Sequence, residues 1–168
     1  MVELLDIVDA HDRVLGRATR AEVHRTQRLH RAVHMLVSDA KGRIYLQKRA
    51  ATKDTNPNCW DSSAAGHVDS GEDYIHSAVR ELSEELGIVQ SVDDLELFHQ
   101  RAPSADNGFE HQRFFRVKTT QTISPCEIEI AEGRWFSLEE IDAWVASADK
   151  ALTLDLKTVW PVYRGTTD

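Results

Sequence analysis

Short runs in which apolar and polar residues alternate recur along the chain, and two pairs of them flank turn residues. The segment LLDIVDAHDRVLGRATR, residues 4–20, predicts a β-hairpin that turns at residues 9–12. Residues 31–49, RAVHMLVSDAKGRIYLQKR, predict a second hairpin with DAKG as its turn. A polar loop should follow at residues 50–58. Further strands are predicted over the ranges 59–68, 95–101, 110–119 and 133–137.

Two segments near the C-terminus have the spacing of helices. Residues 137–148, SLEEIDAWVASA, predict a helix with Ser137 as its N-cap. Residues 152–164 predict a last helix that ends near Pro161, because proline has no amide hydrogen to continue the helical hydrogen bonds. Together with the strands, these helices predict an α/β (α+β) fold in which a mixed sheet lies between helices.

The composition limits the partners of the chain. Hydrophobic residues are 41% and charged residues 29% of 168, which suits one globular domain, residues 1–168, with a sizeable core. The formal charge of −8 argues against general affinity for nucleic acid or an anionic membrane, since both need clustered positive charge. A small anionic substrate therefore needs a few local cations or a bound metal.

The two cysteines and the first residues both favour a cytoplasmic protein. Cys59 and Cys126 have no metal-ligand spacing, and a secreted disulfide framework normally uses more cysteines. The start MVELLDIVDAHDR has no basic segment followed by an apolar run. We therefore expect two reduced thiols in the cytoplasm.

Residues 73–86 predict a third helix, which carries an acidic stripe beside its apolar stripe. Glu81, Glu84 and Glu85 are three and four residues apart, so their side chains lie on one side of the helix. Arg80 can balance the charge of one glutamate but not of all three. The apolar positions with the same spacing are Ile75, Ala78, Val79, Leu82 and Leu86.

Glycines on both sides of this helix fix where the acidic stripe lies. Gly66 and Gly71 predict a tight turn before it, and Gly87 predicts its end. An acidic stripe on an arbitrary helix is usually a solvated face, but a loop–helix–loop unit holds these carboxylates at a defined place. Carboxylate oxygens so held suit Mg²⁺ or Mn²⁺, which keep several waters for a phosphate-bearing substrate.

The same segment resembles the Nudix box, the signature of the Nudix hydrolase superfamily. At about 6% usage per residue type, seven fixed positions match by chance in about one of 10⁸ to 10⁹ windows, so the resemblance is specific. It implies the Nudix fold, a mixed sheet between helices with a loop–helix–loop catalytic motif. The box residues, which show no departure from the pattern, are Gly66, Glu72, Arg80, Glu81, Leu82, Glu84, Glu85, Gly87 and Ile88.

The resemblance implies a metal-dependent hydrolase of diphosphates, typically of a nucleoside diphosphate linked to another group. Glu81, Glu84 and Glu85 are then the metal-binding carboxylates, and the Gly66 carbonyl is a further ligand. The expected cofactor is Mg²⁺, for which Mn²⁺ can substitute. The expected partner is a small diphosphate substrate, with neither nucleic acid nor membrane.

The resemblance also implies roles for the residues around the metal ligands. Arg80 should orient the cluster through a salt bridge to Glu72. One carboxylate must accept a proton from the attacking water. Glu81 is one candidate, and Glu129 or Glu132 in CEIEIAEGRWF is the other, with an exposed strand edge as the alternative reading of that pair.

A narrower resemblance lies upstream, where residues 29–68 look like the matching part of isopentenyl-diphosphate isomerases, a branch built on the Nudix fold. Arg49 and Lys53 match basic residues that hold the substrate diphosphate. His30 and His67 match metal ligands, which implies a second metal site. Glu110 falls where the isomerases have a carboxylate that serves metal binding and proton transfer.

Departures from the isomerase pattern argue against isomerase chemistry. The catalytic cysteine of that branch would stand at Ala65, and Cys59 belongs to a different position. His24 lies six residues before His30, one fewer than the pattern expects, and Gly108 stands where another acid should be. An intact Nudix box without the thiol favours a hydrolase of the isomerase-like branch.

Two other functions compete with the hydrolase: an isopentenyl-diphosphate isomerase, in which another residue replaces the thiol, and a catalytically silent nucleotide-binding module. No motif in the chain specifies one substrate. Trp60, Phe109 and Phe114 either stack on a base or pack in the core, and we favour the core. A homodimer is compatible with the sequence, which carries no signal of oligomeric state.

Overall fold

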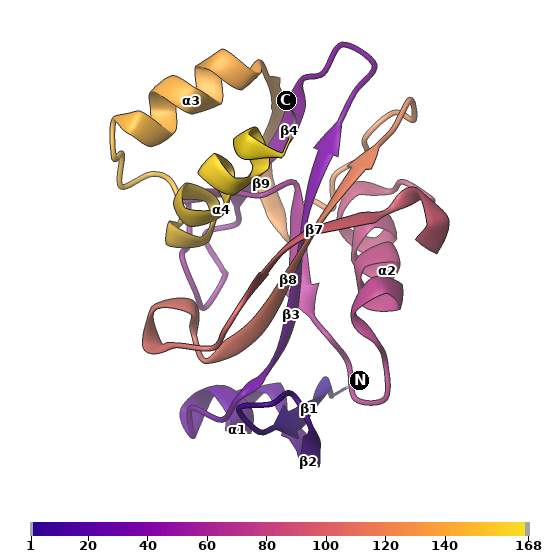
Figure 1. The fold of residues 1–168 in the computed structure, drawn as a ribbon, viewed down its shortest axis with the longest axis vertical. Helices are drawn as coiled ribbons and strands as arrows, with labels where there is room; N and C mark the ends of the chain where they lie inside the picture. Colours follow the sequence, from indigo (N-terminus) through magenta and orange to yellow (C-terminus); the bar gives the residue numbers. More distant parts are fainter. Residues whose placement is uncertain (1, 167–168) are drawn as a thin grey trace.

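The computed structural model describes residues 2–166 and contains a twisted mixed sheet with helices on both faces (Figure 1). This is the α+β architecture that the sequence predicts. The helices are α1 (Arg20–Arg25), α2 (Tyr74–Leu86), α3 (Leu138–Ala146) and α4 (Leu154–Gly165), with 3₁₀ turns at Val92–Asp94 and Ala105–Asn107. The strands are β1 (Leu4–Val8), β2 (Val14–Thr19), β3 (His30–Ser38), β4 (Ile44–Arg49), β5 (Trp60–Asp61), β6 (Ala64–His67), β7 (Glu96–Arg101), β8 (Glu110–Lys118) and β9 (Ile130–Phe136).

Strand β3 is the centre of the seven-stranded sheet. One of its edges pairs in parallel with β8 along its whole length, from His30 opposite Glu110 to Ser38 opposite Lys118. The other edge is shared between β4 and β6, both antiparallel to β3. Since β4 and β6 pair with different parts of this edge, the two strands diverge from each other. Strand β4 also pairs with β5 and β9. The predicted DAKG turn joins β3 to β4, with Gly42 at a φ of 77°.

The alternation of side chains along β3 assigns a different core to each face of the sheet. Val33, Met35 and Val37 pack on the face covered by α2, with Ala78, Leu82 and Leu86 of that helix in the same cluster. Leu36 packs on the opposite face with residues of α3 and α4. In Figure 1 the two helical layers lie on either side of the sheet.

Helix α2 begins and ends as predicted. Asp73 is its N-cap, and the Asp73 side chain accepts a hydrogen bond from the backbone N–H of His76 at 2.9 Å. Gly87 ends the helix in the left-handed conformation, with a φ of 66°, as helix-terminating glycines commonly do. The caps and the buried apolar stripe therefore fix where the acidic residues of α2 lie.

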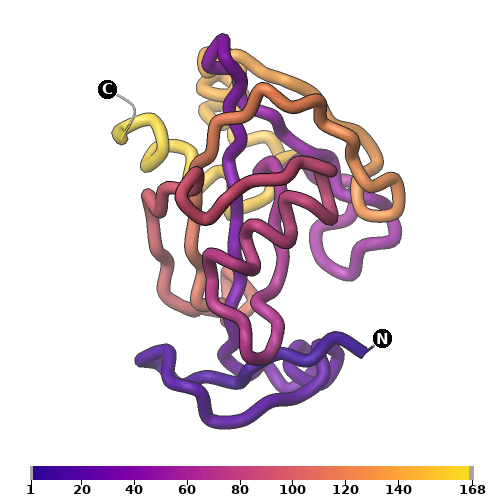
Figure 2. The backbone as a smooth tube through the Cα atoms, turned by 90° about the vertical axis from the view of Figure 1, so that its right-hand side faces the viewer, coloured from indigo at the N-terminus to yellow at the C-terminus, as the bar shows by residue number. Residues whose placement is uncertain are grey.

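The N-terminal hairpin forms a separate two-stranded sheet that lies across one end of the molecule (Figure 2). Its turn lies between β1 and β2, as predicted. The short helix α1 follows directly, with Thr19 as its N-cap, and the sequence pattern did not predict it. Gln27, with a φ of 52°, then reverses the chain into β3.

The prediction that the last helix ends near Pro161 is wrong, because α4 continues through Pro161 to Gly165. A proline inside a helix costs about 3 kcal/mol. Trp160 and Tyr163 flank it and are 2% and 6% exposed, and burial of such a ring contributes about 4–6 kcal/mol. Trp160 Nε1 also donates to Asp142 of α3 at 2.7 Å. Tertiary packing thus outweighs the local preference. Within residues 2–166, no helix has the length and apolar character needed to cross a membrane.

Candidate active site

A cleft of about 720 Å³ brings together the predicted site residues from α2, β6, β8 and the loops around them. Most of them line this cleft, but His30, Glu72 and Glu132 do not, and the ring centres of His30 and His67 are 5.2 Å apart. Their chemical roles remain predictions. The lining residues among them are Arg49, Lys53, Gly66, His67, Arg80, Glu81, Glu84, Glu85, Glu110 and Glu129.

Arg80 organises the acidic side of the cleft. Its Nε and Nη2 atoms donate to the Glu72 carboxylate at 3.0–3.2 Å, so the expected salt bridge is present. Its Nη1 atom donates to Glu81 at 2.8 Å and to Glu84 at 3.1 Å. The Glu81 carboxylate lies directly against Gly66, where the Cβ of any other residue would displace it. Glycine at this position therefore lets the Glu81 carboxylate lie against the backbone of the box turn.

Glu85 is the most buried of the three glutamates and spans the two diverging strands. Its Oε2 atom accepts a hydrogen bond from Gln47 of β4 at 2.6 Å and one from the backbone N–H of Ala65 of β6 at 3.4 Å. Burial, and secondarily the nearby Glu81 carboxylate, raise the pKa of Glu85 to about 8. Burial raises the pKa of Glu81 to about 7 although Arg80 opposes the shift. Two buried carboxylates with too little compensating charge fit a hard divalent cation.

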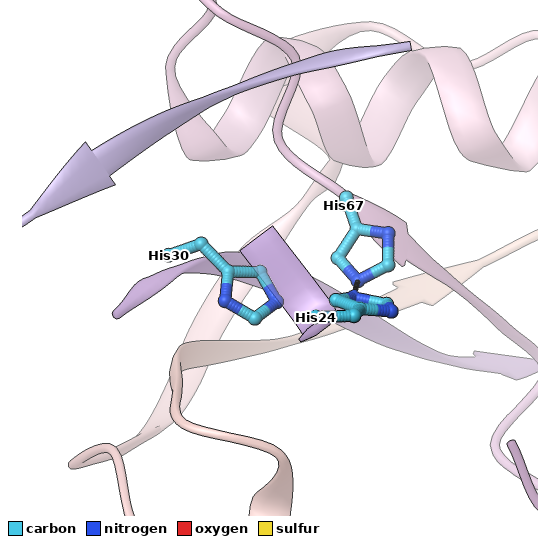
Figure 3. A group of neighbouring side chains, drawn as sticks. All are labelled: His24, His30 and His67. Atoms are coloured by element: carbon cyan, nitrogen blue, oxygen red, sulfur yellow. Dashed lines mark hydrogen bonds between the residues drawn. The ribbon is translucent and has the colours of Figure 1, made fainter. Parts of the chain in front are cut away.

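Three histidines from α1, β3 and β6 lie close together (Figure 3), and two of them, His24 and His67, line the cleft. Among the His, Cys, Asp and Glu side chains of residues 2–166, one group of three or more has potential metal-ligand atoms that all lie within 4.8 Å of one another. Its members are His24, His30 and His67. The box glutamates do not converge to that distance without a cation. His24 Nε2 lies 3.2 Å from His67 Nε2, and the buried His30 Nε2 has no hydrogen-bond partner among the described residues.

His24 lies with His30 and His67 although it stands one residue nearer to His30 in sequence than the isomerase pattern expects. Helix α1 and the left-handed Gln27 together shorten the path between His24 and His30, so that their ring centres are 5.2 Å apart. The shorter spacing in sequence is compensated by the local fold. We call His24, His30 and His67 the histidine group.

Glu110 completes the histidine group electrostatically. Its Oε1 atom lies 3.3 Å from His67 Nε2 and 3.6 Å from His30 Nε2. Burial opposes ionisation of Glu110, but the adjacent imidazoles of His30 and His67 outweigh it and hold its pKa well below the usual range. Burial lowers the pKa of His67, whereas Glu110 and Glu3 raise it, with a net value of about 9.

The basic residues predicted to hold a diphosphate lie at the end of β4 and in the loop after it. Arg49 Nη1 lies 3.6 Å from Asp61 Oδ2, and Arg49 Nε donates to the Thr55 carbonyl at 3.0 Å. Lys53 forms an ion pair with Glu129. Glu129 lines the cleft, whereas Glu132 lies exposed on β9 outside the residues that line it, which separates the two alternatives for this acid.

The chain matches the family model of the NUDIX domain over residues 28–156. It belongs to the Nudix family. This Nudix protein is 32% identical to isopentenyl-diphosphate Delta-isomerase 2 of Photorhabdus laumondii, over 95% of this chain and 89% of the relative. It is 45% identical to an uncharacterized Nudix hydrolase of Yersinia pestis, over 52% of this chain and 48% of the relative. The crystal structure of DR0079 from Deinococcus radiodurans superposes with a TM-score of 0.78 and 26% identity, covering 96% of this chain and 98% of that one.

Comparison with the isomerases directs attention to thiols near the Nudix cleft. Ala65 lines the cleft where the resemblance expects a cysteine. Cys126 also lines it, and the backbone N–H of Cys126 donates to the Glu85 carbonyl at 2.8 Å. Sequence reasoning missed this location, since Cys126 is 41 positions after Glu85 and no motif contains both.

Of the three aromatic residues considered for base stacking, two pack in the core of the Nudix domain as favoured. Phe114 is 1% exposed and its ring stacks on His34. Trp60 packs against Phe136 of β9. Phe109 instead lines the cleft, so the preference for the core does not hold for this residue. Its backbone has a φ of 65°, in a turn that alternation of polar and apolar residues does not reveal.

Proposed function

We propose that this Nudix protein is a Mg²⁺-dependent hydrolase that cleaves a phosphoanhydride bond in a diphosphate substrate, such as a nucleoside diphosphate derivative. The observation that carries the proposal is the burial of Glu81 and Glu85 in one cleft with Arg49 and Lys53. Glu81 shares Arg80 with two other carboxylates, and Glu85 has only neutral hydrogen-bond donors. The intact box and the relatives named Nudix hydrolases support the same reaction class.

Different residues of the cleft would bind the diphosphate and the cation. Arg49 and Lys53 would pair with the terminal oxygens of the diphosphate, and Lys53 would leave Glu129 to do so. Glu81, Glu84 and Glu85, with the Gly66 carbonyl, would hold the divalent cation. A cation bound there would supply positive charge to the diphosphate and lower the pKa of the attacking water. Arg80 would keep Glu81 and Glu84 in place through its shared hydrogen bonds.

A carboxylate must take the proton of the attacking water. Glu129 is our candidate, because it lines the cleft and is released when Lys53 turns to the substrate. Glu81 is the alternative, since its pKa of about 7 lies near the working pH, where a general base is most efficient. Replacement of Glu129 by Gln should distinguish them by the loss or retention of turnover with saturating Mg²⁺.

We include a second cation site at the histidine group in this proposal. Three imidazoles with a carboxylate suit a borderline transition metal better than Mg²⁺. The buried, unpartnered His30 Nε2 supports such a ligand role, because an unsatisfied buried nitrogen is otherwise costly. Glu110 would neutralise part of the charge of this cation.

The test is metal-dependent turnover. Purified protein is incubated with Mg²⁺ and nucleoside diphosphates, nucleotide sugars, dinucleoside polyphosphates or prenyl diphosphates, and released phosphate or monophosphate is measured. We expect hydrolysis that stops with EDTA and returns with excess Mg²⁺. If none of these compounds is hydrolysed but one of them raises the melting temperature of the protein, the protein is instead a binding module.

Isomerisation of isopentenyl diphosphate is the second candidate, favoured by the similarity to isomerases along 95% of the chain and by Cys126 in the cleft. Formation of dimethylallyl diphosphate that is lost in Cys126→Ser would establish it. If dimethylallyl diphosphate does not form, isomerisation is excluded, and the absence of a thiol at Ala65 explains why.

A further inference from the structure

The N-terminal hairpin, formed by β1 and β2, lies outside the residues that match the Nudix family model and yet contacts the box. The family model matches residues 28–156, whereas the two strands of the hairpin lie within residues 4–19. Figure 2 shows the hairpin against the turn that precedes α2. We call that turn, residues 68–72, the box turn. Within it the box pattern specifies only Glu72, so the contacts with the hairpin are a feature that the pattern does not contain.

Asp6 of β1 makes the side-chain contacts between the hairpin and the box turn. Its Oδ1 atom accepts a hydrogen bond from Ser70 Oγ at 2.6 Å, and its Oδ2 atom accepts one from the backbone N–H of Gly71 at 3.3 Å. The backbone N–H of Ser70 also donates to the Leu4 carbonyl at 2.8 Å. The Asp6 side chain is 12% exposed, so little water competes for these hydrogen bonds.

The box turn decides how the charge of Arg80 is shared. The turn ends at Glu72, which accepts hydrogen bonds from the Nε and Nη2 atoms of Arg80. This leaves Nη1 for Glu81 and Glu84, which are 2.8 Å and 3.1 Å away. Gly71, with a φ of 86°, gives the turn backbone freedom and has no side chain to fix it. Contacts from outside the turn must therefore hold Glu72 against Arg80.

A displaced box turn would change the competition for the box carboxylates. If Glu72 moves away, the guanidinium of Arg80 is free to donate more of its N–H groups to Glu81 and Glu84. A cation would then compete with a better-paired arginine for the same oxygens, and its affinity would fall. Ser77 Oγ also donates to Glu72, so the loss of Asp6 should weaken cation binding rather than abolish it.

We propose that Asp6 is a positioning residue for the box carboxylates. It holds the box turn against β1, and the turn keeps Glu72 on Arg80, so that Glu81 and Glu84 remain available to a cation. This inference rests on the proposed function, which places the cation at the box. It makes the N-terminal hairpin part of the metal site.

The experiment measures Mg²⁺ affinity directly. Mg²⁺ is titrated calorimetrically into the full chain without substrate, because a cation that prefers oxygen ligands reports on the box rather than on the histidine group. We expect Asp6→Ala to weaken Mg²⁺ binding by about fivefold or more. The Mg²⁺ concentration for half-maximal phosphate release should rise in proportion, and excess Mg²⁺ should recover most of the lost rate.

Two further variants test the connection through Ser70. Ser70→Ala should weaken Mg²⁺ binding in the same direction, and the double variant with Asp6→Ala should bind Mg²⁺ within about twofold of Asp6→Ala alone, because both changes break one contact. Asp6→Asn keeps an oxygen that can accept from Ser70 Oγ and should retain more affinity than Asp6→Ala. It also serves if Asp6→Ala folds poorly.

Asp9→Ala is the matched control within the same hairpin. The Asp9 carboxylate accepts hydrogen bonds from the backbone N–H groups of His11 and Arg13 and from Arg13 Nε, so it stabilises the hairpin turn itself. Its removal should leave Mg²⁺ affinity within about twofold of the wild type. The melting temperature of each variant without Mg²⁺ shows how far the hairpin has been destabilised.

The outcomes separate this inference from the proposed function. Unchanged Mg²⁺ affinity in Asp6→Ala, or an equal loss in Asp9→Ala, overturns the positioning role while leaving a hydrolase. Losses that add fully in the double variant overturn the connection through Ser70. If the wild type binds Mg²⁺ but hydrolyses no diphosphate, the proposed function fails and the calorimetric comparison still decides the role of Asp6. A wild type that binds no Mg²⁺ overturns both.

Discussion

The box helix and the histidine group lie along the same cleft but compensate their charges differently. In the box, Arg80 is shared by Glu72, Glu81 and Glu84, and Glu85 has only neutral hydrogen-bond donors. In the histidine group, Glu110 lies beside two imidazoles, and Glu3 and Asp54 each lie beside one. One side therefore has excess negative charge, and the other approaches neutrality by binding protons.

This difference implies two kinds of cation site. The box carboxylates are short of positive charge, so a hard cation adds what is missing. The neighbouring carboxylates raise the pKa of His67 to about 9, so His67 carries a proton at neutral pH, and metal binding there should release that proton. The two sites should accordingly differ in preferred metal, in pH dependence and in their weight in the reaction.

The largest expected effect is on the box side. Glu85→Gln keeps the shape of the side chain and an oxygen that can accept the hydrogen bond from Gln47, but it removes the charge that would hold Mg²⁺. We expect kcat to fall about a hundredfold or more with the fold intact, measured by phosphate release and by circular dichroism. Glu139→Gln, on the exposed first turn of α3, is the control. Near-full activity in both Glu84→Gln and Glu85→Gln would show that these glutamates do not bind the catalytic metal. The difference between the box and the histidine group would then disappear.

A smaller effect is expected from the histidine group. His30→Gln should weaken binding of Zn²⁺ or Mn²⁺ by about tenfold or more, while hydrolysis with saturating Mg²⁺ falls less than in Glu85→Gln. Metal content after dialysis and calorimetric titration measure the affinity. His76→Gln, at an exposed position of α2, controls for the loss of an imidazole. Unchanged transition-metal affinity in His30→Gln would show that the group is not a cation site.

The smallest effect concerns stability against pH in the presence of EDTA. Folding raises the pKa of Glu81 to about 7, of Glu85 to about 8 and of His67 to about 9, from ordinary values of 4.5, 4.5 and 6.5. A group whose pKa is raised on folding stabilises fully below its ordinary pKa, and that contribution is lost as pH rises through the folded value. The melting temperature should therefore fall by several degrees or more between about pH 5 and pH 9.

Two additions sharpen the pH experiment. Glu85→Gln should make the decline shallower, because it removes one of the titrating groups, and Mg²⁺ should restore the melting temperature most strongly at high pH. The low pKa of Glu110 acts in the opposite direction and only in acid, since its stabilisation is present above about 4.5 and is lost as pH falls. A flat profile over the whole range would contradict the raised pKa values on both sides of the cleft.

The box side of the site was predictable from sequence because its determinants are local. Arg80, Glu81 and Glu84 share one helix, whose start at Asp73 and end at Gly87 follow capping rules. The turn that places Glu72 against Arg80 is also local. Short-range periodicity and a known motif therefore predicted both the box helix and the residues that surround Arg80.

The histidine side depends on contacts that sequence spacing does not contain. His24 reaches the site through the unpredicted helix α1 and the left-handed Gln27. Glu110 lies beside His30 because of a long-range strand pairing. Pro161 failed as a helix stop for a related reason, since the packing of α4 against the sheet outweighs the local preference of proline.

The parallel pairing of β3 with β8 also sets the order in which the site can form. Residue n of β3 pairs with residue n + 80 of β8 along the whole ladder, so a long loop must close before the first of these contacts forms. During synthesis at about 5–20 residues per second, about 4–16 s separate the appearance of His30 from that of Glu110. The β3–β4 hairpin and the box helix need no such closure. We therefore expect refolding to proceed in stages, with the histidine–carboxylate contact forming after the box helix and limiting when the cleft becomes competent to bind.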